Sequence, residues 1–258
     1  NANIWSSLKY PLPACTFTMK EGDDLIRPLH TALLPSLGAS RTFPIVYRYA
    51  PRCLHGLDLR HPTIEQHIGQ LKILLTHGSI PSFLGRETRI SLDQLQLESG
   101  STIPFFSLPL SYQCLFTPCW LTNLWGFLRT EGISLLSDDF PRLKPLRTGD
   151  FTLMDHFVGL GTLTDTQLLS CNRVRMFLGV STVAEISTGC GFRLRSEALT
   201  ATPFLGNAME RGFPQESPSV QDIETWSQAL LTVATPMGHL LHSLGVWTSA
   251  PPWEPMWY

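Results

Sequence analysis

Charged side chains are scarce in this 258-residue chain. They make up 16% of it, against about a quarter in typical globular domains, so its polar surface must depend largely on Ser, Thr, Gln and Asn. The formal net charge is -2 and the pI is near 6.5. These values exclude the strongly basic field that a free-standing nucleic-acid binder usually presents. Any nucleic-acid contact therefore has to be a local patch.

Common catalytic signatures are also missing. The sequence contains no G-x-S-x-G, no H-E-x-x-H, no G-x-x-x-x-G-K-[ST] and no G-x-G-x-x-G, which removes the usual nucleophile, zinc and phosphate-loop sites. Two acidic pairs, Asp23-Asp24 and Asp138-Asp139, have the oxygen ligands that Mg²⁺ prefers. The first pair suits a helix start, where the helix dipole stabilises negative charge. The second pair precedes Phe140-Pro141 in a predicted loop. The sequence predicts no catalytic residue, no metal ligand and no cofactor.

Long uninterrupted apolar runs are absent as well. Residues 101–128 and 225–253 lack Asp, Glu, Lys and Arg, but three prolines interrupt the first, and Pro236, Gly238 and two histidines interrupt the second. Neither therefore predicts a membrane span. The chain has no C-x-x-C pair, and its six cysteines are dispersed: Cys15, Cys53, Cys114, Cys119, Cys171 and Cys190. Dispersed thiols are typical of reduced, intracellular proteins. We therefore expect a cytoplasmic or nuclear location and no membrane partner.

What the chain does have is apolar content and helical punctuation. Hydrophobic residues make up 43% and aromatics 10%, enough for a substantial core. Apolar spacing, caps and terminal glycines predict helices over 21–36, 62–77, 91–99, 118–132, 151–160 and 165–178, and from 218 or 219 to Pro236. Residues 189–199 suit a small hairpin. The class is mainly α: an irregular multi-helical assembly with a small β-hairpin and an extended Trp/Pro-rich C-terminal tail from Pro251.

The same spacing predicts which side chains face inward. Over 62–77 the inward stripe is Ile64, Ile68, Leu71 and Leu75, with Gly78 ending the helix in the left-handed region. Over 21–36 the inward residues are Leu25, Leu29, Ala32 and Leu33, and two prolines are expected to kink or shorten the helix: Pro28 and Pro35. In the later part of the chain, helical spacing places four aromatic side chains in the core: Trp120, Trp125, Phe157 and Phe177.

One stretch interleaves cations with aromatic rings. Arg41, Arg48 and Arg52 alternate with Tyr47 and Tyr49. Guanidinium groups neutralise phosphates while aromatic rings stack on bases, so this pattern is typical of surfaces that track a nucleic-acid backbone. Ordinary solvated arginines give the same pattern, and the sequence leaves both interpretations open.

Several segments resemble a known family in order and approximate spacing. They resemble the region after the palm in non-LTR-type retroelement reverse transcriptases, through Tyr10–Thr18, Leu34–Gly38 with Arg41–Pro44, Gly56-Leu57, Gly149–Met154, Cys171–Leu178, Trp226, Ala229-Leu230, Leu244–Trp247 and Trp253–Tyr258. The resemblance implies a segment of a longer protein, with the fingers and the catalytic palm upstream. It further implies a thumb-like or connection segment over 1–85 and a helical accessory domain over 86–258.

The resemblance also sets the functional expectations. The parent would be an RNA-directed DNA polymerase, and this segment would assist template-primer binding without catalytic residues of its own. Its partners would be the template-primer duplex, through the parent protein, and the upstream palm domain. The alternative is an α-helical protein-interaction module with an apolar, Trp-rich contact surface, for which self-association stays open.

Overall fold

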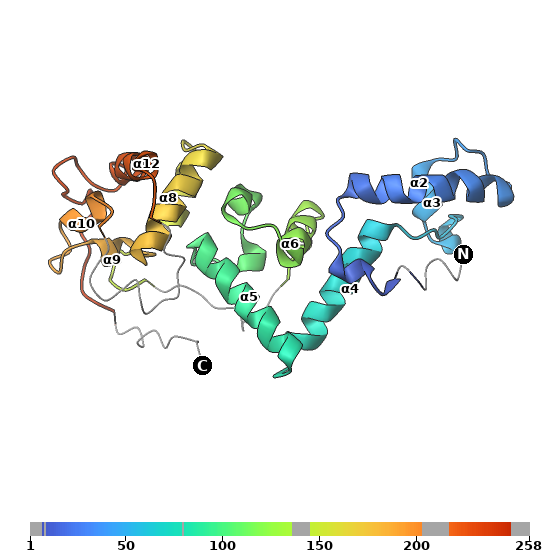
Figure 1. Cartoon of the computed structure of the whole chain (residues 1–258), viewed down its shortest axis with the longest axis horizontal. Coiled ribbons are helices and arrows are strands. Elements are labelled where there is room, and N and C mark those ends of the chain that lie inside the picture. Colours follow the sequence, from blue (N-terminus) through green and yellow to red (C-terminus); the bar gives the residue numbers. More distant parts are fainter. Residues whose placement is uncertain (1–6, 8, 79, 136–144, 203–216, 249–258) are drawn as a thin grey trace. The chain divides into compact units, whose positions relative to one another are not determined.

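The structure is a computed structural model that describes residues 7, 9–78, 80–135, 145–202 and 217–248. It is mainly helical (Figure 1), and β-pairing among the described residues is limited to isolated antiparallel bridges. The chain divides into two compact units, residues 1–89 with 118–132 and residues 90–117 with 133–258. The stretch 118–132 thus belongs to the first unit. The boundary at residue 85 that the resemblance implies would instead assign this stretch to the second part of the chain. The tail predicted from Pro251 lies outside the described residues.

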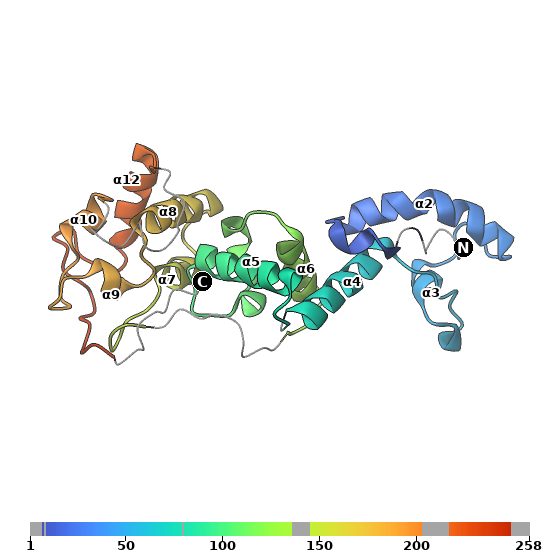
Figure 2. The same ribbon diagram turned by 60° about the horizontal axis from the view of Figure 1, so that its bottom comes forward.

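The first unit is built around α4 (Pro62–His77), whose predicted bounds are confirmed. A short 3₁₀ turn, η1 (Leu12–Ala14), and two helices, α2 (Met19–Ser36) and α6 (Trp120–Thr130), pack against it, as Figure 2 allows the reader to follow. The remaining elements of the unit are α3 (Ile45–Tyr49), η2 (Arg52–Leu54) and the start of α5 (Phe83–Ser99).

The buried face of α4 is polar, which overturns the predicted apolar stripe. Ile68 and Leu75 are 41% and 62% exposed, and the fully buried positions are Pro62, Thr63, Gln66, His67, Gln70 and Leu74. This polar face is explained by the extended segment before α2, whose backbone contacts α4. Because that segment belongs to no helix or sheet, its N–H and C=O groups need side-chain partners. Gln66 accepts from the N–H of Phe17 at 2.9 Å, and Gln70 donates to the carbonyl of Cys15 at 2.8 Å. Buried backbone needs such partners.

Helix α2 also turns a different face inward from the predicted one. Its buried residues are Gly22, Ile26, His30 and Leu34, while Leu25 and Ala32 are exposed and Leu29 and Leu33 half-buried. A capping box between Thr18 and Glu21 fixes the start. The helix runs through Pro28 to Ser36, so the expected shortening is wrong; both prolines are exposed, and carbonyls that lose an N–H partner there can turn to water.

Two more details of the first unit differ from expectation. Gly78 has φ -56° and continues right-handed, so α4 does not end in the left-handed region. In α6, Trp125 is buried as predicted, but Trp120 is only half-buried. Phe127, on the same helix, stacks on the buried His67 of α4 with ring centroids 4.0 Å apart.

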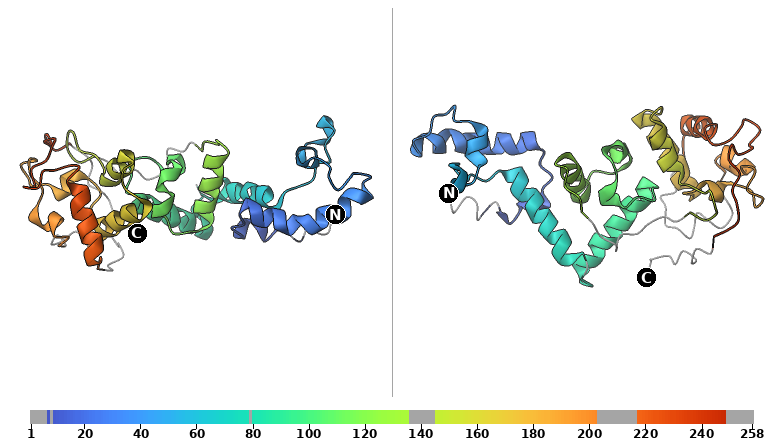
Figure 3. Two further views of the ribbon diagram at one scale, coloured as in Figure 1. Left: turned by 90° about the horizontal axis from the view of Figure 1, so that it is seen from above. Right: turned by 180° about the vertical axis from the view of Figure 1, so that it is seen from behind.

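The second unit packs α8 (Asp165–Leu178) against α12 (Val220–Leu230), seen side by side in Figure 3. Thr164 caps α8 and Gly179 closes it in the left-handed region, and the predicted bounds 165–178 are confirmed. α7 (Leu153–Leu160) ends at Gly161, also as predicted. The smaller elements are η3 (Phe105–Ser107), η4 (Leu110–Leu115), α9 (Val183–Ile186) and α10 (Ser196–Leu199).

Aromatic packing forms the centre of this unit. Phe157 and Trp226 are buried and meet edge to face at 6.1 Å, and the indole N–H of Trp226 donates to the carbonyl of Ala198 at 2.7 Å. Phe177 is only half-buried, against the prediction. The helix expected to reach Pro236 ends at Leu230. The predicted hairpin is reduced to one bridge, Ser187 to Leu194, and is followed by α10 rather than by more strand.

A fully buried arginine ties helix ends together in the second unit. The guanidinium of Arg175 donates to the carbonyls of Leu97 and Glu98, at 2.5 and 3.3 Å, and to the side-chain oxygen of Asn172 at 2.7 Å. A further contact reaches the carbonyl of Val180 at 3.4 Å. Carbonyls at the end of α5 carry partial negative charge. Burial lowers the pKa of Arg175 to about 10, which leaves it cationic at neutral pH.

Candidate functional site

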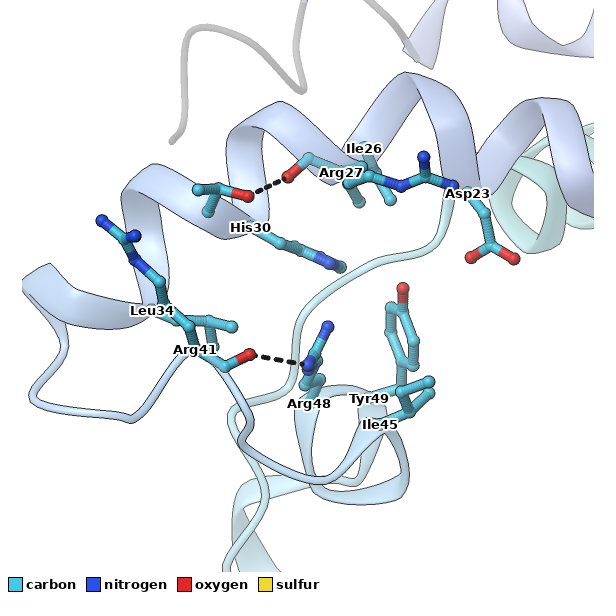
Figure 4. Close-up of a pocket in the computed structure, with 10 residues that line it drawn as sticks. Asp23, Ile26, Arg27, His30, Leu34, Arg41, Ile45, Arg48 and Tyr49 are labelled. Atoms are coloured by element: carbon cyan, nitrogen blue, oxygen red, sulfur yellow. Dashed lines mark hydrogen bonds between the residues drawn. The ribbon is translucent and has the colours of Figure 1, made fainter.

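A cavity of about 350 Å³ lies between α2 and the segment 41–49 of the first unit (Figure 4). We call it the α2–α3 cavity. Its lining residues are Asp23, Ile26, Arg27, His30, Thr31, Leu34, Arg41, Ile45, Arg48 and Tyr49. One wall therefore comes from a single helix face and the other from a loop and a short helix.

The α2 wall follows from helical spacing. Ile26, His30 and Leu34 stand four residues apart, so they share one face, and all three are buried. Asp23 and Arg27 flank that face. Arg27 pairs with Asp24 at 2.6 Å across one helical turn, with both side chains largely exposed, so this pair contributes little to stability.

The opposite wall is held by its own backbone contacts. Arg48 donates from Nε to the carbonyl of Phe43 at 2.9 Å and from Nη2 to that of Arg41 at 3.3 Å, which closes the loop before α3. Leu57 and Leu59 donate backbone N–H groups to the carbonyls of Tyr47, at 2.8 Å, and Arg48, at 2.9 Å. Arg48 thus has a structural role in addition to lining the cavity.

The structure brings together three of the five residues predicted for nucleic-acid contact. Arg41, Arg48 and Tyr49 line the α2–α3 cavity. Tyr47 and Arg52 are exposed and do not line it. The prediction that these two residues contact nucleic acid stays a prediction, at positions outside the cavity.

His30 is the main site residue that sequence reasoning missed. It is 6% exposed, and its Nε2 is buried without a hydrogen-bond partner. Figure 4 shows the imidazole pointing from α2 across the cavity toward Arg48 and Tyr49. A signal was present in the sequence, because His30 is spaced by four from Ile26 and Leu34, but the alternative stripe through Leu25 and Leu29 is more apolar.

Tyr49 lies between two histidines. Its ring is 5.7 Å from that of His30 and 5.4 Å from that of His61, the latter edge to face. His61 is buried, and its Nε2 lies 3.2 Å from a carboxylate oxygen of Asp23. Its Nδ1, like the Nε2 of His30, is buried without a partner. The α2–α3 cavity is therefore backed by a cluster of polar rings.

The electrostatics favour an anion. The lining has three arginines against one aspartate. Burial, and then the neighbouring Arg48 and His61, lower the pKa of His30, so that its imidazole is neutral at pH 7. Burial likewise raises the pKa of Tyr49, which keeps its hydroxyl protonated. Neutral His and Tyr donate or accept hydrogen bonds, and the arginines supply positive charge.

The acidic residues of the two candidate pairs do not act together in the part of the chain that the structure describes. Among the described residues, no group of three or more His, Cys, Asp or Glu side chains is placed to hold a metal ion. The carboxylates of Asp23 and Asp24 contact different partners, His61 and Arg27. Asp138-Asp139 lies outside the described residues.

Comparison with known proteins adds no assignment. No family model, curated protein or solved structure matches the chain. Within the described part of the chain, none of the helices has the length and apolar character needed to cross a bilayer.

Proposed function

We propose that this chain is a non-catalytic C-terminal segment of a reverse-transcriptase-like retroelement protein, and that its first unit helps to hold a template-primer duplex next to an upstream palm domain. The observation that carries this proposal is the α2–α3 cavity. It gathers Arg27, Arg41 and Arg48, which are separated in sequence, around Tyr49. The resemblance of the surrounding segments to the post-palm region supports the same function.

Holding a duplex requires side chains that bind phosphate groups, and guanidinium groups do so. The planar fork of arginine binds a phosphate through two hydrogen bonds. The net charge of the whole chain is -2, so a phosphate contact has to come from such a local gathering of cations. Affinity that depends on a few arginines is weak alone and strongly dependent on salt.

The salt dependence of duplex binding tests the proposal. Each neutralised phosphate contributes about -0.9 to the slope of log affinity against log salt concentration. Arg41→Gln should therefore make the slope shallower by about 0.9. Arg86→Gln is the matched control, since it removes the same charge from an exposed helix position outside the cavity lining. Fluorescence anisotropy with a labelled primer-template duplex measures both.

Two outcomes would contradict the proposal. The first is that the chain has no affinity for the duplex even at low salt. The second is that Arg41→Gln and Arg86→Gln change the salt slope equally. Arg48→Gln is a poor choice for this purpose because Arg48 also closes the 41–48 loop.

A protein-interaction module is the second candidate function. Ile45 and Val46 of α3 are 65% and 75% exposed, and Leu54 of η2 is also exposed, a local apolar concentration typical of contact surfaces. Trp125 and Trp226 are buried in the two units, Trp247 is 57% exposed, and Trp253 and Trp257 of the predicted Trp-rich tail lie outside the described residues. Sedimentation velocity distinguishes the candidates. Self-association through this surface should persist at high salt, whereas duplex binding should not.

A further inference from the structure

We propose that the α2–α3 cavity receives one unstacked nucleotide, with its phosphate at the arginines and its base against His30 and Tyr49. This inference rests on the proposed function and deepens it. Duplex contact alone would need only an exposed row of cations, whereas the structure has a concave site with buried polar groups.

The first argument is the unpartnered nitrogen of His30. Native proteins rarely leave a buried polar atom without a hydrogen-bond partner. The Nε2 of His30 is such an atom, and the ring points into the cavity (Figure 4). A base edge carries both donors and acceptors, so it can pair with either tautomer of a neutral imidazole.

The second argument is the size and lining of the cavity. A volume of about 350 Å³ lies in the range of small-molecule sites, and it is too small for a continuous duplex. Ile26, Leu34 and Ile45 supply apolar walls for a flat ring. Tyr49 adds an aromatic surface, and unpaired bases are commonly held by such surfaces.

The third argument is the separation of charges around the cavity. Arg41 lies at the Leu34 end of α2, and Asp23 lies at the opposite end near the hydroxyl of Tyr49 (Figure 4). Arg27 lies beside Asp23, but its charge is paired with Asp24. A phosphate suits the first end. A carboxylate accepts from the amino or imino groups of a base, so the second end suits the base. The polarity of the cavity thus matches a nucleotide better than a bare phosphate.

The test compares two hairpin duplexes of the same sequence, one blunt and one ending in a single unpaired nucleotide. The full chain should bind the second about tenfold more tightly, the order expected for one base held on an aromatic surface. Ile45→Trp should abolish this preference, because residue 45 lines the cavity and a bulky ring there fills it. Val46→Trp is the matched control, an exposed neighbour that does not line the cavity, and should keep the preference.

A second variant tests the role of the His30 nitrogen without filling the cavity. His30→Leu removes the unpartnered nitrogen and keeps an apolar side chain in the buried position. Its affinities for the two hairpins should become equal, because the preference for the unpaired nucleotide is lost. Thermal unfolding of the same sample establishes that the variant is folded.

The outcomes separate the two proposals. Equal affinity of the wild type for both hairpins overturns this inference and leaves the proposed function intact. Absence of binding to either hairpin at low salt overturns both. Displacement by a free nucleoside monophosphate, without any preference between the hairpins, would assign the cavity to a free nucleotide and overturn the strand-end assignment. Retention of the preference in Ile45→Trp would also overturn it.

Discussion

Replacing Arg175 by Met should strongly destabilise the second unit. Met keeps the length of the side chain but has no N–H donor. The change leaves the side-chain oxygen of Asn172 without the Arg175 donor, in a site where Arg175 is fully buried. The carbonyls of Leu97 and Glu98 each lose one of two donors, because they also accept from the N–H of Gly100 at 3.2 Å and the amide of Asn172 at 2.8 Å. Each buried acceptor that loses its partner costs about 1–3 kcal/mol, and the losses overlap. We expect the free energy of unfolding to fall by about 1–3 kcal/mol, the cost of a buried acceptor left without a partner.

Urea unfolding followed by circular dichroism measures this loss. Arg173→Met is the matched control, because Arg173 lies on the same helix but is exposed, and pairs with Asp222 at 3.5 Å. Asp222 is buried but keeps its hydrogen bonds from Ser219, so the control, which removes only the exposed partner, should lose at most about 1 kcal/mol. A loss below about 1 kcal/mol for Arg175→Met, or equal losses in the two variants, would refute the assignment of Arg175 as the group that holds these helix ends.

Three further predictions concern stability. Gly100→Ala should lower the free energy of unfolding by about 1–3 kcal/mol in thermal or urea unfolding, because Gly100 has φ +61° and an added Cβ would lie 2.9 Å from Cζ of Arg175. Gly132→Ala is the control. Its φ is +67° but an added Cβ would meet nothing within 4 Å, so it should lose only the smaller conformational contribution. Gln66→Leu should cost about 2–3 kcal/mol, since the backbone of Phe17 loses its partners. Burial lowers the pKa of three histidines, His30, His67 and His156. The melting temperature should therefore fall, relative to its value near pH 7, as the pH drops below about 6.5, because the unfolded chain gains protons there that the folded one resists.

Helix ends were predictable because their signals are local. Thr164 and Gly179 bracket α8 within one turn of each boundary, and Pro62 occupies the first position of α4. The early start of α5 also has a local cause that the apolar pattern hid. The hydroxyl of Ser82 accepts from the N–H of Gly85 at 3.1 Å, so a cap stands well before the predicted start at residue 91.

Inward faces were harder to predict because they depend on distant partners. The apolar pattern of α4 points to Ile68 and Leu75, but the helix turns Gln66 and Gln70 inward to satisfy the backbone of a segment about fifty positions earlier. Only the fold brings that segment to α4. Residues that bury polar atoms against backbone carry no signature in a hydrophobicity pattern.

The candidate site shows the same division. Arg41, Arg48 and Tyr49 are close in sequence, so their interleaving was visible without a structure. His30 and Asp23 come from α2, and their relation to Tyr49 depends on how α2 lies over the 41–49 segment. Sequence reasoning therefore found the cationic wall of the cavity and missed the polar wall opposite.

Hydrogen–deuterium exchange of the full chain, with and without a primer-template duplex at low salt, tests the central claim most directly. Exchange reports local opening of each segment. If the α2–α3 cavity contacts nucleic acid, the duplex should slow exchange in peptides that cover 23–34 and 41–49 and leave α8, residues 165–178, unchanged. Bound duplex with unchanged exchange in 23–34 and 41–49, or with protection confined to the second unit, would contradict the account.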